Sequence, residues 1–313
     1  MSRCLYCYQL LKENEHDFHP SCSRKIFERP VPPALPYSAH DLTTLAKEII
    51  QSQTSVTGVQ AKLSLHIKEA EKEGTSRFTI VGLWGGYILK PPTTNYPQLP
   101  EVEDLTMHLA AIAKIKTAPH SLIRLQSGSL AYITKRMDRV KKGKLAMEDM
   151  CQLTERLTED KYLGSYEQIG KDLLKYAATP RLDLINLFEL VLFCFLTGNS
   201  DMHLKNFSLL EQPGLGMILS PAYDLVNTTL VNPADEEEMA LTLNGKKKKI
   251  NRQDFTTAMN TLKIEEKQQL NIFKKMEKAL PQWLEIVQIS FLSEEFKTLY
   301  KNIIKERFKR IYE

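Results

Sequence analysis

The apolar stretch at residues 182–197 constrains the fold of this chain more than any other part of its sequence. It is about one residue shorter than the lower limit for a membrane-spanning helix, and it contains Asp183, Asn186 and Glu189. The stretch therefore predicts an almost wholly buried helix, and no membrane span is expected. A chain of 313 residues with 42% apolar content can supply the core around it, and this composition excludes collagen-like, disordered and disulfide-scaffold classes.

A cluster of metal-binding residue types lies at the N-terminus. Three of the five cysteines fall within the first 22 residues, and Cys4, Cys7, His19 and Cys22 have the spacing C-x2-C-x11-H-x2-C. Zinc prefers thiolate and imidazole ligands, and a 28-residue piece is too small for a core of its own. Residues 1–28 are therefore a candidate zinc-binding segment. The alternative is that the cysteines are reduced and pack on the following domain, with His19 exposed.

The N-terminus gives no sign of export. It lacks an uninterrupted apolar segment with a small-residue cleavage site. The odd number of cysteines, with Cys151 and Cys194 in apolar surroundings, indicates reduced thiols rather than a disulfide framework. We therefore expect a cytoplasmic protein that binds no membrane.

The order of strands and helices predicts an α+β fold with two lobes. A proline-rich connector at residues 29–36 cannot be a helix or an interior strand, so it marks a boundary. Residues 37–138 form a small strand-rich N-lobe. Residues 139–313 form a larger C-lobe, expected to be all-helical apart from one hairpin at 206–225 with the turn Gln212-Pro213-Gly214. The N-lobe elements are helices at 41–51 and 101–113 and strands at 61–67, 78–83, 87–90, 121–125 and 129–134.

The loop after the buried helix concentrates chemically active side chains. Gly198 ends the helix, and Asp201, His203, Lys205 and Asn206 follow closely. The five-residue step from Asp201 to Asn206 equals that of the protein-kinase catalytic loop, where the Asp accepts the substrate hydroxyl proton and the Asn holds a metal ion. The alternative is an ordinary capped loop with a satisfied buried Asp.

Asp224 completes a candidate metal site. It follows Asn206 by eighteen residues at the far end of the hairpin, so the returning chain brings it back near Asn206. Carboxylate and amide oxygens suit a hard cation such as Mg²⁺, which completes its shell with water and phosphate. Asp201 is then left for another task.

Further kinase parts occur in the correct order. Lys90 ends a strand, where its ammonium can pair with nucleotide phosphates, and Glu103 follows near the start of a helix, where it can pair with that lysine. Alone, these residues are also explained by a solvated strand end and by the helix macrodipole. Residues 55–58 precede a strand, as a phosphate-covering loop requires, but they lack the G-x-G-x-x-G pattern.

Seven ordered segments closely resemble the HipA-type toxin kinases of bacterial toxin–antitoxin systems: S-V-T-G-V-Q-A-K, Y-I-L-K-P, L-P-E-V-E, K-R-M-D-R, E-D-M-C-Q, G-N-S-D-M-H-L-K-N-F and P-A-Y-D-L. The resemblance runs from about residue 55 to residue 243. It implies a two-lobed, protein-kinase-like (HipA-like) fold that transfers the γ-phosphate of ATP to a serine or threonine of a target protein. The known targets in the family are aminoacyl-tRNA synthetases, whose inhibition stalls translation.

The resemblance also implies roles for the matching residues. Asp201 matches the catalytic residue, Asn206 and Asp224 match the magnesium ligands, and Lys90 matches the phosphate-binding lysine. The hinge that contacts adenine matches Lys135 to Met137. The remaining expected ATP-binding positions are Ser55, Val56, Thr57, Gly58, Glu103, His203 and Lys205.

Ser55 matches the loop serine that is autophosphorylated in the family, and Thr57 is a second candidate hydroxyl. A phosphate adds a charge of about −1.5 to −2. On a loop that lies over the phosphates of ATP, this charge repels the nucleotide or expels the loop. Autophosphorylation should therefore lower activity.

The part before the phosphate loop resembles the short HipT toxins of tripartite HipBST systems. Full-length members carry an additional subdomain of about a hundred residues there, whereas 54 residues precede Ser55 here. In the tripartite systems HipS supplies the missing subdomain and the helix-turn-helix protein HipB completes the operon, so HipS-like and HipB-like partners are expected. A net charge of +4 is small, so DNA contact is expected only through the antitoxin.

Two other functions stay open at this point. A small-molecule phosphotransferase could use the same catalytic loop. A zinc-containing regulatory module could bind ATP without turnover. Transfer of labelled phosphate to a protein, to a metabolite or to neither distinguishes the three.

Overall fold

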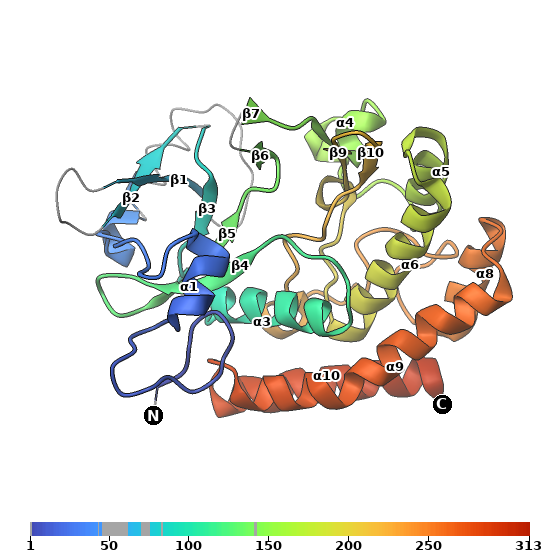
Figure 1. The fold of residues 1–313 in the computed structure, drawn as a ribbon. Helices are drawn as coiled ribbons and strands as arrows, with labels where there is room; N and C mark the ends of the chain where they lie inside the picture. The colour runs from blue at the N-terminus through green and yellow to red at the C-terminus, as the bar shows by residue number, and fades with distance from the viewer. Residues whose placement is uncertain (1, 43, 46–61, 70–75, 83, 141–142) are drawn as a thin grey trace. The chain divides into compact units, whose positions relative to one another are not determined.

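This computed structural model describes residues 2–42, 44–45, 62–69, 76–82, 84–140 and 143–313 (Figure 1). The chain divides into two compact units. The first consists of Met1–Asp104 with Ala118–Met137, and the second consists of Leu105–Thr117 with Asp138–Glu313. Residues 105–117 thus group with the second unit, although residues on both sides of them in the sequence belong to the first.

The first unit is built on a five-stranded antiparallel sheet with the order β2-β1-β3-β5-β4 (Figure 1). Leu63 pairs with Leu89 and Leu65 pairs with Tyr87, so the alternating apolar residues of β1 and β3 share one buried face. This pattern confirms the strands expected from alternation. Their bounds are β1 Leu63–Lys68, β2 Arg77–Val81, β3 Tyr87–Lys90, β4 His120–Arg124 and β5 Leu130–Lys135.

The N-terminal segment packs on this unit through aromatic side chains. Helix α1 spans Pro20–Phe27 and begins with its proline, where a missing N–H costs no hydrogen bond. The ring of Phe27 lies edge-on to Phe18 at 5.4 Å and to Phe78 at 5.7 Å between centroids. The segment thereby shares the core of the sheet.

The proline-rich connector runs alongside the edge strand β2. The N–H of Ala34 donates to the carbonyl of Ser76 at 2.8 Å, and the N–H of Phe78 donates to the carbonyl of Ala34 at 2.8 Å. Prolines are tolerated there because an edge needs hydrogen bonds on one side only. Helix α3, Leu99–Ile112, confirms the helix expected at 101–113. The helix expected at 41–51 falls largely outside the described residues, although residues 39–42 are helical.

Helix α6, Pro180–Thr197, is the core helix of the second unit. Most of its apolar side chains are buried because α5, α9 and α10 pack against it, whereas Leu182 in its first turn is exposed. This confirms the predicted buried helix, and within the described ranges no helix reaches the length and apolarity of a membrane span. The other helices of the unit are α4 Met150–Leu153, η1 Thr158–Asp160, α5 Tyr166–Tyr176, η2 Leu204–Asn206, α7 Thr228–Val231, α8 Arg252–Thr261, α9 Glu266–Ile289 and α10 Glu294–Tyr312.

The predicted hairpin is confirmed as β9 Ser208–Gln212 and β10 Gly216–Leu219, with Gly214 in the turn at φ 80°. The expectation that the rest of this lobe is all-helical is wrong. Strand β8, Met147–Asp149, adds to the hairpin beside β9, and β6 Arg139–Val140 pairs with β7 Gly143–Lys144. These strands have two or three residues and depend on pairing partners rather than on their own alternation, so the sequence carries no period for them.

Candidate functional site

The loop with the candidate catalytic residues begins where α6 ends. Gly198 caps the helix in the left-handed conformation, with φ 74°. A Cβ at this position would come within 2.7 Å of the Oδ1 of Asn227, so space and conformation both require glycine. Asn199 is fully buried, and its Oδ1 accepts a hydrogen bond from the N–H of Asp201 at 3.2 Å. The path of the chain into Asp201 is therefore set by local capping.

Asp201 is held through both its backbone and its side chain. The Nδ2 of Asn206 donates to the backbone carbonyl of Asp201 at 3.0 Å, and the N–H of His203 donates to the same oxygen at 2.9 Å. The hydroxyl of Tyr162 donates to the Oδ1 of Asp201 at 2.6 Å. Burial, followed by the contact with Asp201, raises the pKa of Tyr162, so the phenol remains a proton donor. The amide of Asn206 and the N–H of His203 therefore fix the backbone of Asp201, and the neutral hydroxyl of Tyr162 orients its carboxylate.

The hairpin returns the chain to this loop. The hydroxyl of Tyr223 donates to the carbonyl of Lys205 at 2.9 Å and lies 2.6 Å from the Oγ of Ser208. Tyr223 precedes Asp224 and Lys205 precedes Asn206, so the two expected magnesium ligands lie on neighbouring segments. Asp224 has φ 58°, a conformation that non-glycine residues adopt rarely and that is frequent at functional sites.

The donor set of these two residues fits a magnesium ion. The Nδ2 of Asn206 is used by the carbonyl of Asp201, which fixes the orientation of the amide and leaves its Oδ1 on the opposite side. Asn206 itself is 6% exposed. Its amide oxygen and the carboxylate of Asp224 are the hard oxygen ligands that Mg²⁺ takes from a protein before water and phosphate complete its shell.

His203 and Lys205 make contacts within the second unit. Burial lowers the pKa of His203, although the carboxylate of Asp201 opposes this shift, and the imidazole ring meets the ring of Tyr162 edge-on at 5.0 Å. The Nζ of Lys205 pairs with the Oδ2 of Asp149 at 2.8 Å, and Asp149 also caps helix α4. These contacts support the geometry of the loop, and the ATP-binding roles of His203 and Lys205 stay predictions.

In the first unit, the expected lysine–glutamate ion pair is present. The Nζ of Lys90 lies 2.5 Å from the Oε1 of Glu103, and the two residues are 4% and 2% exposed. Lys90 ends β3 opposite Tyr132 of β5, and its ammonium lies 5.4 Å from the centroid of that ring. A buried pair of this kind fixes the position of both charges, since neither can be separated from the other cheaply.

The expected adenine hinge follows β5. The N–H of Lys135 donates to the carbonyl of Pro119 at 2.8 Å, and the N–H of Arg136 donates to the carbonyl of Gly86 at 2.8 Å. The ammonium of Lys135 pairs with the carboxylate of Glu28. Met137 is partly exposed at the end of this segment. The backbone of the hinge is therefore anchored, and its contact with adenine stays a prediction.

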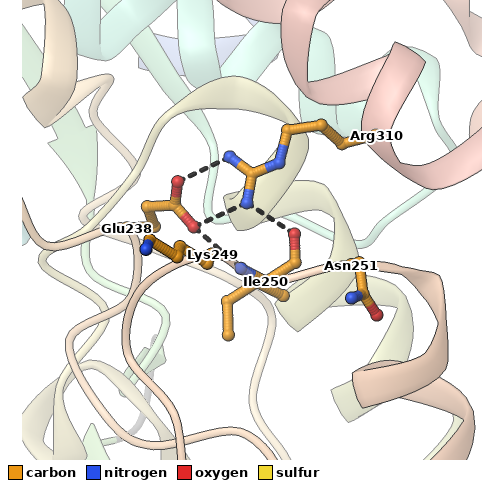
Figure 2. A pocket seen from close by; sticks show the side chains of 5 residues that line it. All are labelled: Glu238, Lys249, Ile250, Asn251 and Arg310. Carbon is orange, nitrogen blue, oxygen red and sulfur yellow. Dashed lines mark hydrogen bonds and ion pairs between the residues drawn. The ribbon is translucent and has the colours of Figure 1, made fainter.

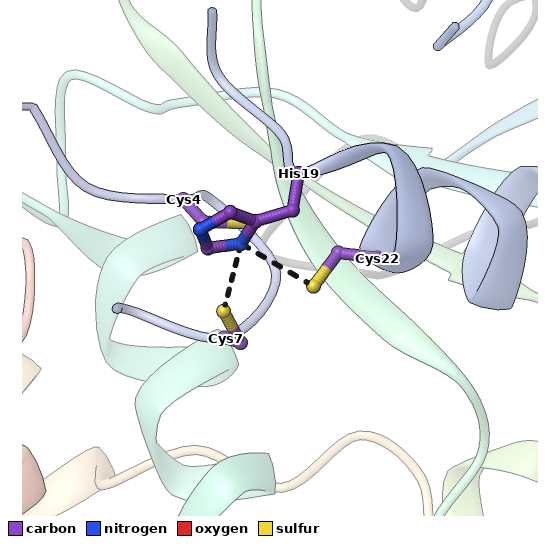
Figure 3. A group of neighbouring side chains, drawn as sticks. All are labelled: Cys4, Cys7, His19 and Cys22. Atoms are coloured by element: carbon purple, nitrogen blue, oxygen red, sulfur yellow. Dashed lines mark hydrogen bonds between the residues drawn. The ribbon is translucent and has the colours of Figure 1, made fainter. Parts of the chain in front are cut away.

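Two groups of expected residues remain. Ser55, Val56, Thr57 and Gly58 lie outside the described residues. Cys4, Cys7, His19 and Cys22 are brought together in the first unit (Figure 3).

Two residues that support the site, Asp149 and Tyr162, have no predicted role from the sequence. Asp149 lies within the motif E-D-M-C-Q, and it forms a capping box with Gln152 at the start of α4. The three-residue spacing of an Asp and a Gln is typical of this cap, so the sequence could have predicted it. The ion pair of Asp149 with Lys205 joins residues 56 apart. The contact of Tyr162 with Asp201 joins residues 39 apart, and no local pattern marks it.

A pocket of about 330 Å³ lies in the second unit, and none of the residues that line it is among the candidate site residues (Figure 2). The guanidinium of Arg310 donates to both carboxylate oxygens of Glu238, at 2.5 and 2.9 Å, and to the carbonyl of Ile250 at 2.6 Å. Burial raises the pKa of Glu238, but the bonds from Arg310 and from the N–H of Ile250 outweigh it, and the pKa lies below the usual value. Arg310, Glu238 and the backbone of Ile250 satisfy one another, so this part of the pocket has a structural role.

Comparison with known proteins gives a consistent result. The family model described as the HipA-like C-terminal domain matches residues 54–284. A Haemophilus influenzae protein named "Putative kinase" is 29% identical over 249 residues, which are 73% of this chain and 69% of that protein. The Sinorhizobium fredii protein named "Putative kinase Y4dM" is 33% identical over 186 residues, 56% of this chain and 45% of the relative. The chain thus spans less than half the length of this second relative.

Two solved structures share the fold. A chain of the Shewanella oneidensis MR-1 complex of HipA, HipB and operator DNA, a toxin–antitoxin system, has a TM-score of 0.70 at 20% identity and covers 88% of this chain and 71% of its own. The Helicobacter pylori proinflammatory kinase CtkA has a TM-score of 0.54 at 17% identity, over 72% of this chain and 87% of its own. At these identities the likeness shows the fold alone. It confirms the expected α+β, kinase-like architecture.

Proposed function

This chain belongs to the family of proteins with a HipA-like C-terminal domain, and on that premise we propose that it is an ATP- and Mg²⁺-dependent serine/threonine protein kinase that acts as a toxin. The observation that carries the proposal is the arrangement around Asp201. The hydroxyl of Tyr162 orients its carboxylate, the amide of Asn206 fixes its backbone carbonyl, and the bond from Tyr223 to Lys205 joins the segments of Asn206 and Asp224.

Asp201 acts on the acceptor in this proposal. Its carboxylate orients the hydroxyl of the acceptor serine or threonine and takes its proton. The hydroxyl oxygen forms a bond to the γ-phosphorus, the bond from that phosphorus to the β,γ-bridging oxygen breaks, and ADP leaves with the electron pair. Positioning and electrostatic stabilisation supply most of the catalysis in reactions of this kind.

The remaining residues bind and orient the nucleotide. Asn206 and Asp224 hold the magnesium ion, which supplies positive charge to the phosphates when it is bound. Lys90 binds phosphate oxygens, and Glu103 sets the position of its ammonium through the buried ion pair. The backbone at Lys135 to Met137 contacts adenine.

The target and the partners are further parts of the proposal. The acceptor is an aminoacyl-tRNA synthetase, and its modification inhibits translation. A HipB-like antitoxin binds the chain and carries the contact with DNA, which is supported by the HipA, HipB and operator DNA complex named for the structural neighbour. A HipS-like small protein is included because of the resemblance to the short toxins. Co-expression of the neighbouring reading frames with the tagged chain, followed by purification, tests both partners.

The loop at Ser55 is the proposed site of autophosphorylation, with Thr57 as the second acceptor. The Ser55→Asp variant should bind ATP more weakly in a calorimetric titration, because the added negative charge opposes the nucleotide phosphates. Ser55→Ala is the matched control, since it removes the hydroxyl without adding charge, and it should bind ATP more tightly than Ser55→Asp does. Equal affinity of the aspartate and alanine variants would count against the proposal.

The central experiment is incubation of the purified chain with γ-labelled ATP and a bacterial extract, followed by identification of the labelled product. We expect a labelled protein with the wild type and none with Asp201→Asn. Label in a metabolite would instead identify a small-molecule phosphotransferase. ATP binding without any labelled product, together with cellular toxicity of Asp201→Asn, would identify a regulatory module without turnover.

A further inference from the structure

The four N-terminal metal-ligand residues form a compact cluster in the first unit (Figure 3). The sulfur atoms of Cys4, Cys7 and Cys22 and a ring nitrogen of His19 all lie within 4.8 Å of one another. The Sγ of Cys7 is 3.4 Å and the Sγ of Cys22 is 3.6 Å from the Nδ1 of His19. A zinc ion with sulfur at about 2.3 Å and nitrogen at about 2.0–2.1 Å in tetrahedral geometry separates these ligands by about 3.6 Å. The cluster therefore has the dimensions of a tetrahedral zinc site.

The imidazole of His19 is prepared for a cation. Its Nε2 lies 3.0 Å from the carbonyl of Leu10, which can only accept a hydrogen bond, so the ring proton is on Nε2. The Nδ1 then presents one lone pair to two thiols, and a single lone pair cannot satisfy both. A histidine that donates its other N–H to a carbonyl is the usual arrangement at a metal.

The backbone around the cluster forms a tight turn that aims the first two ligands at one point. The N–H of Tyr8 donates to the carbonyl of Cys4 at 2.9 Å, and the N–H of Cys4 donates to the carbonyl of Gln9 at 2.9 Å. Tyr8 has φ 62°, which is unusual for an aromatic residue and closes the turn directly after Cys7. On the other side of the cluster, His19 is the N-cap of α1 and Cys22 lies in its first turn.

We infer that Cys4, Cys7, His19 and Cys22 bind one structural zinc ion as a Cys3His site. All four protein ligands are present, which is typical of a closed structural site rather than a catalytic one. The alternative, reduced cysteines with an exposed histidine, fits less well, because the side chain of His19 is only 20% exposed and its Nδ1 faces the thiols. The three cysteines are not joined by disulfides.

The zinc segment is attached to the sheet and to helix α3. The carbonyl of Leu5 accepts from the N–H of Leu122 at 3.3 Å and from the Oγ of Ser121 at 3.2 Å, both on β4. The hydroxyl of Tyr8 donates to the buried carboxylate of Asp104 at 2.8 Å. Asp104 follows Glu103 on α3, so the metal stabilises the part of the fold that positions the partner of Lys90. Zinc thus contributes folding free energy to the first unit.

Metal analysis of the purified full chain tests this inference without using kinase activity. We expect about one zinc ion per chain for the wild type. Cys7→Ser and His19→Ala should lose most of the zinc, whereas His19→Cys should retain it because a fourth thiolate replaces the imidazole. Cys151→Ala is the matched control, since Cys151 is a buried thiol of the second unit, and it should retain all of the zinc.

A second measurement covers variants that fail to fold. The wild type is treated with a chelator and titrated with Co²⁺, and the visible bands of tetrahedral thiolate-bound cobalt should appear with a one-to-one endpoint and disappear on addition of Zn²⁺. Chelation should also lower the melting temperature, and zinc should restore it. A folded wild type that contains no zinc and gives no such bands, a chain that holds iron instead, or full zinc content in both Cys7→Ser and His19→Ala would overturn the inference.

Discussion

Three carboxylates of this protein have different surroundings. A comparison of one in the first unit with one in the second shows how those surroundings match the proposed role of each. In the first unit, Glu103 is buried against the ammonium of Lys90, so its charge is neutralised by a fixed partner. In the second unit, the carboxylate of Asp201 accepts a hydrogen bond from the neutral hydroxyl of Tyr162. An ion pair suits a group whose proposed role is to position a lysine, whereas a neutral donor suits a group whose proposed role is to accept a proton.

A third carboxylate sharpens the comparison. Glu101 lies on the same helix as Glu103, and its buried Oε2 has no hydrogen-bond partner among the described residues. Burial raises the pKa of Glu101 to about 7, and the nearby charge of Asp104 acts in the same direction. A hydrogen bond from its own backbone opposes this shift without cancelling it, so Glu101 takes up a proton more readily than an exposed glutamate does.

The largest effect is expected at Asp201. The Asp201→Asn variant should keep the fold and lose about 10³-fold or more in kcat, because an amide cannot take the acceptor proton. Steady-state kinetics and cellular toxicity measure this. Glu285→Gln, an exposed position on α9, is the control and should change neither. If Asp201→Asn kept full turnover, Asp201 would not be the group that takes the proton from the acceptor hydroxyl.

Breaking the ion pair of the first unit should affect both activity and stability. Lys90→Met removes the proposed phosphate contact and leaves the buried charge of Glu103 without its partner, so we expect kinase activity to fall sharply and the free energy of unfolding to drop by about 3–5 kcal/mol. The double variant Lys90→Met/Glu103→Leu should recover most of the stability and none of the activity. Equal stability of the wild type and Lys90→Met in urea denaturation would contradict the buried pair.

Glu101 should give the first unit a pH dependence of its own. Its pKa in the folded state is about 7 against an ordinary 4.5, so the folded state binds the proton more tightly than the unfolded chain does. This contribution to stability is complete below about pH 4.5 and is lost as the pH rises through about 7, a change of roughly 1–3 kcal/mol. Glu101→Gln should remove this part of the decline in denaturation curves measured between pH 4.5 and 8. An unchanged slope would show that Glu101 is ionised in the folded protein.

The smallest effect is expected at the neutral donor of the second unit. Tyr162→Phe removes one hydrogen bond to Asp201, so kcat should fall by about threefold to tenfold while the affinity for ATP stays the same. Tyr176→Phe, an exposed tyrosine on α5, is the matched control. A loss as large as that of Asp201→Asn would mean that Tyr162 itself takes part in proton transfer.

Much of the fold could be predicted because its signals are local. The strand at 87–90 has the predicted bounds, and α6 ends at the predicted glycine, since alternation and a left-handed cap depend on neighbouring residues. The hairpin turn at Gly214 is also a local signal, because it depends on a glycine with positive φ. Strand β8 could not be predicted in this way, because three residues become a strand only when β9 lies beside them.

The candidate site also has features that local sequence predicts and features that depend on tertiary packing. The spacing of Asp201, Asn206 and Asp224 and the order of the kinase parts are properties of the sequence, as is the set of four zinc-ligand residue types. Only the tertiary structure decided that Tyr162 bonds to Asp201, that Asp149 pairs with Lys205 and that Nδ1 of His19 faces the thiols. The physical reason is that caps, turns and periodicity are decided within a few residues, whereas a contact across 39 or 56 residues forms only when the packing of the whole unit brings its partners together.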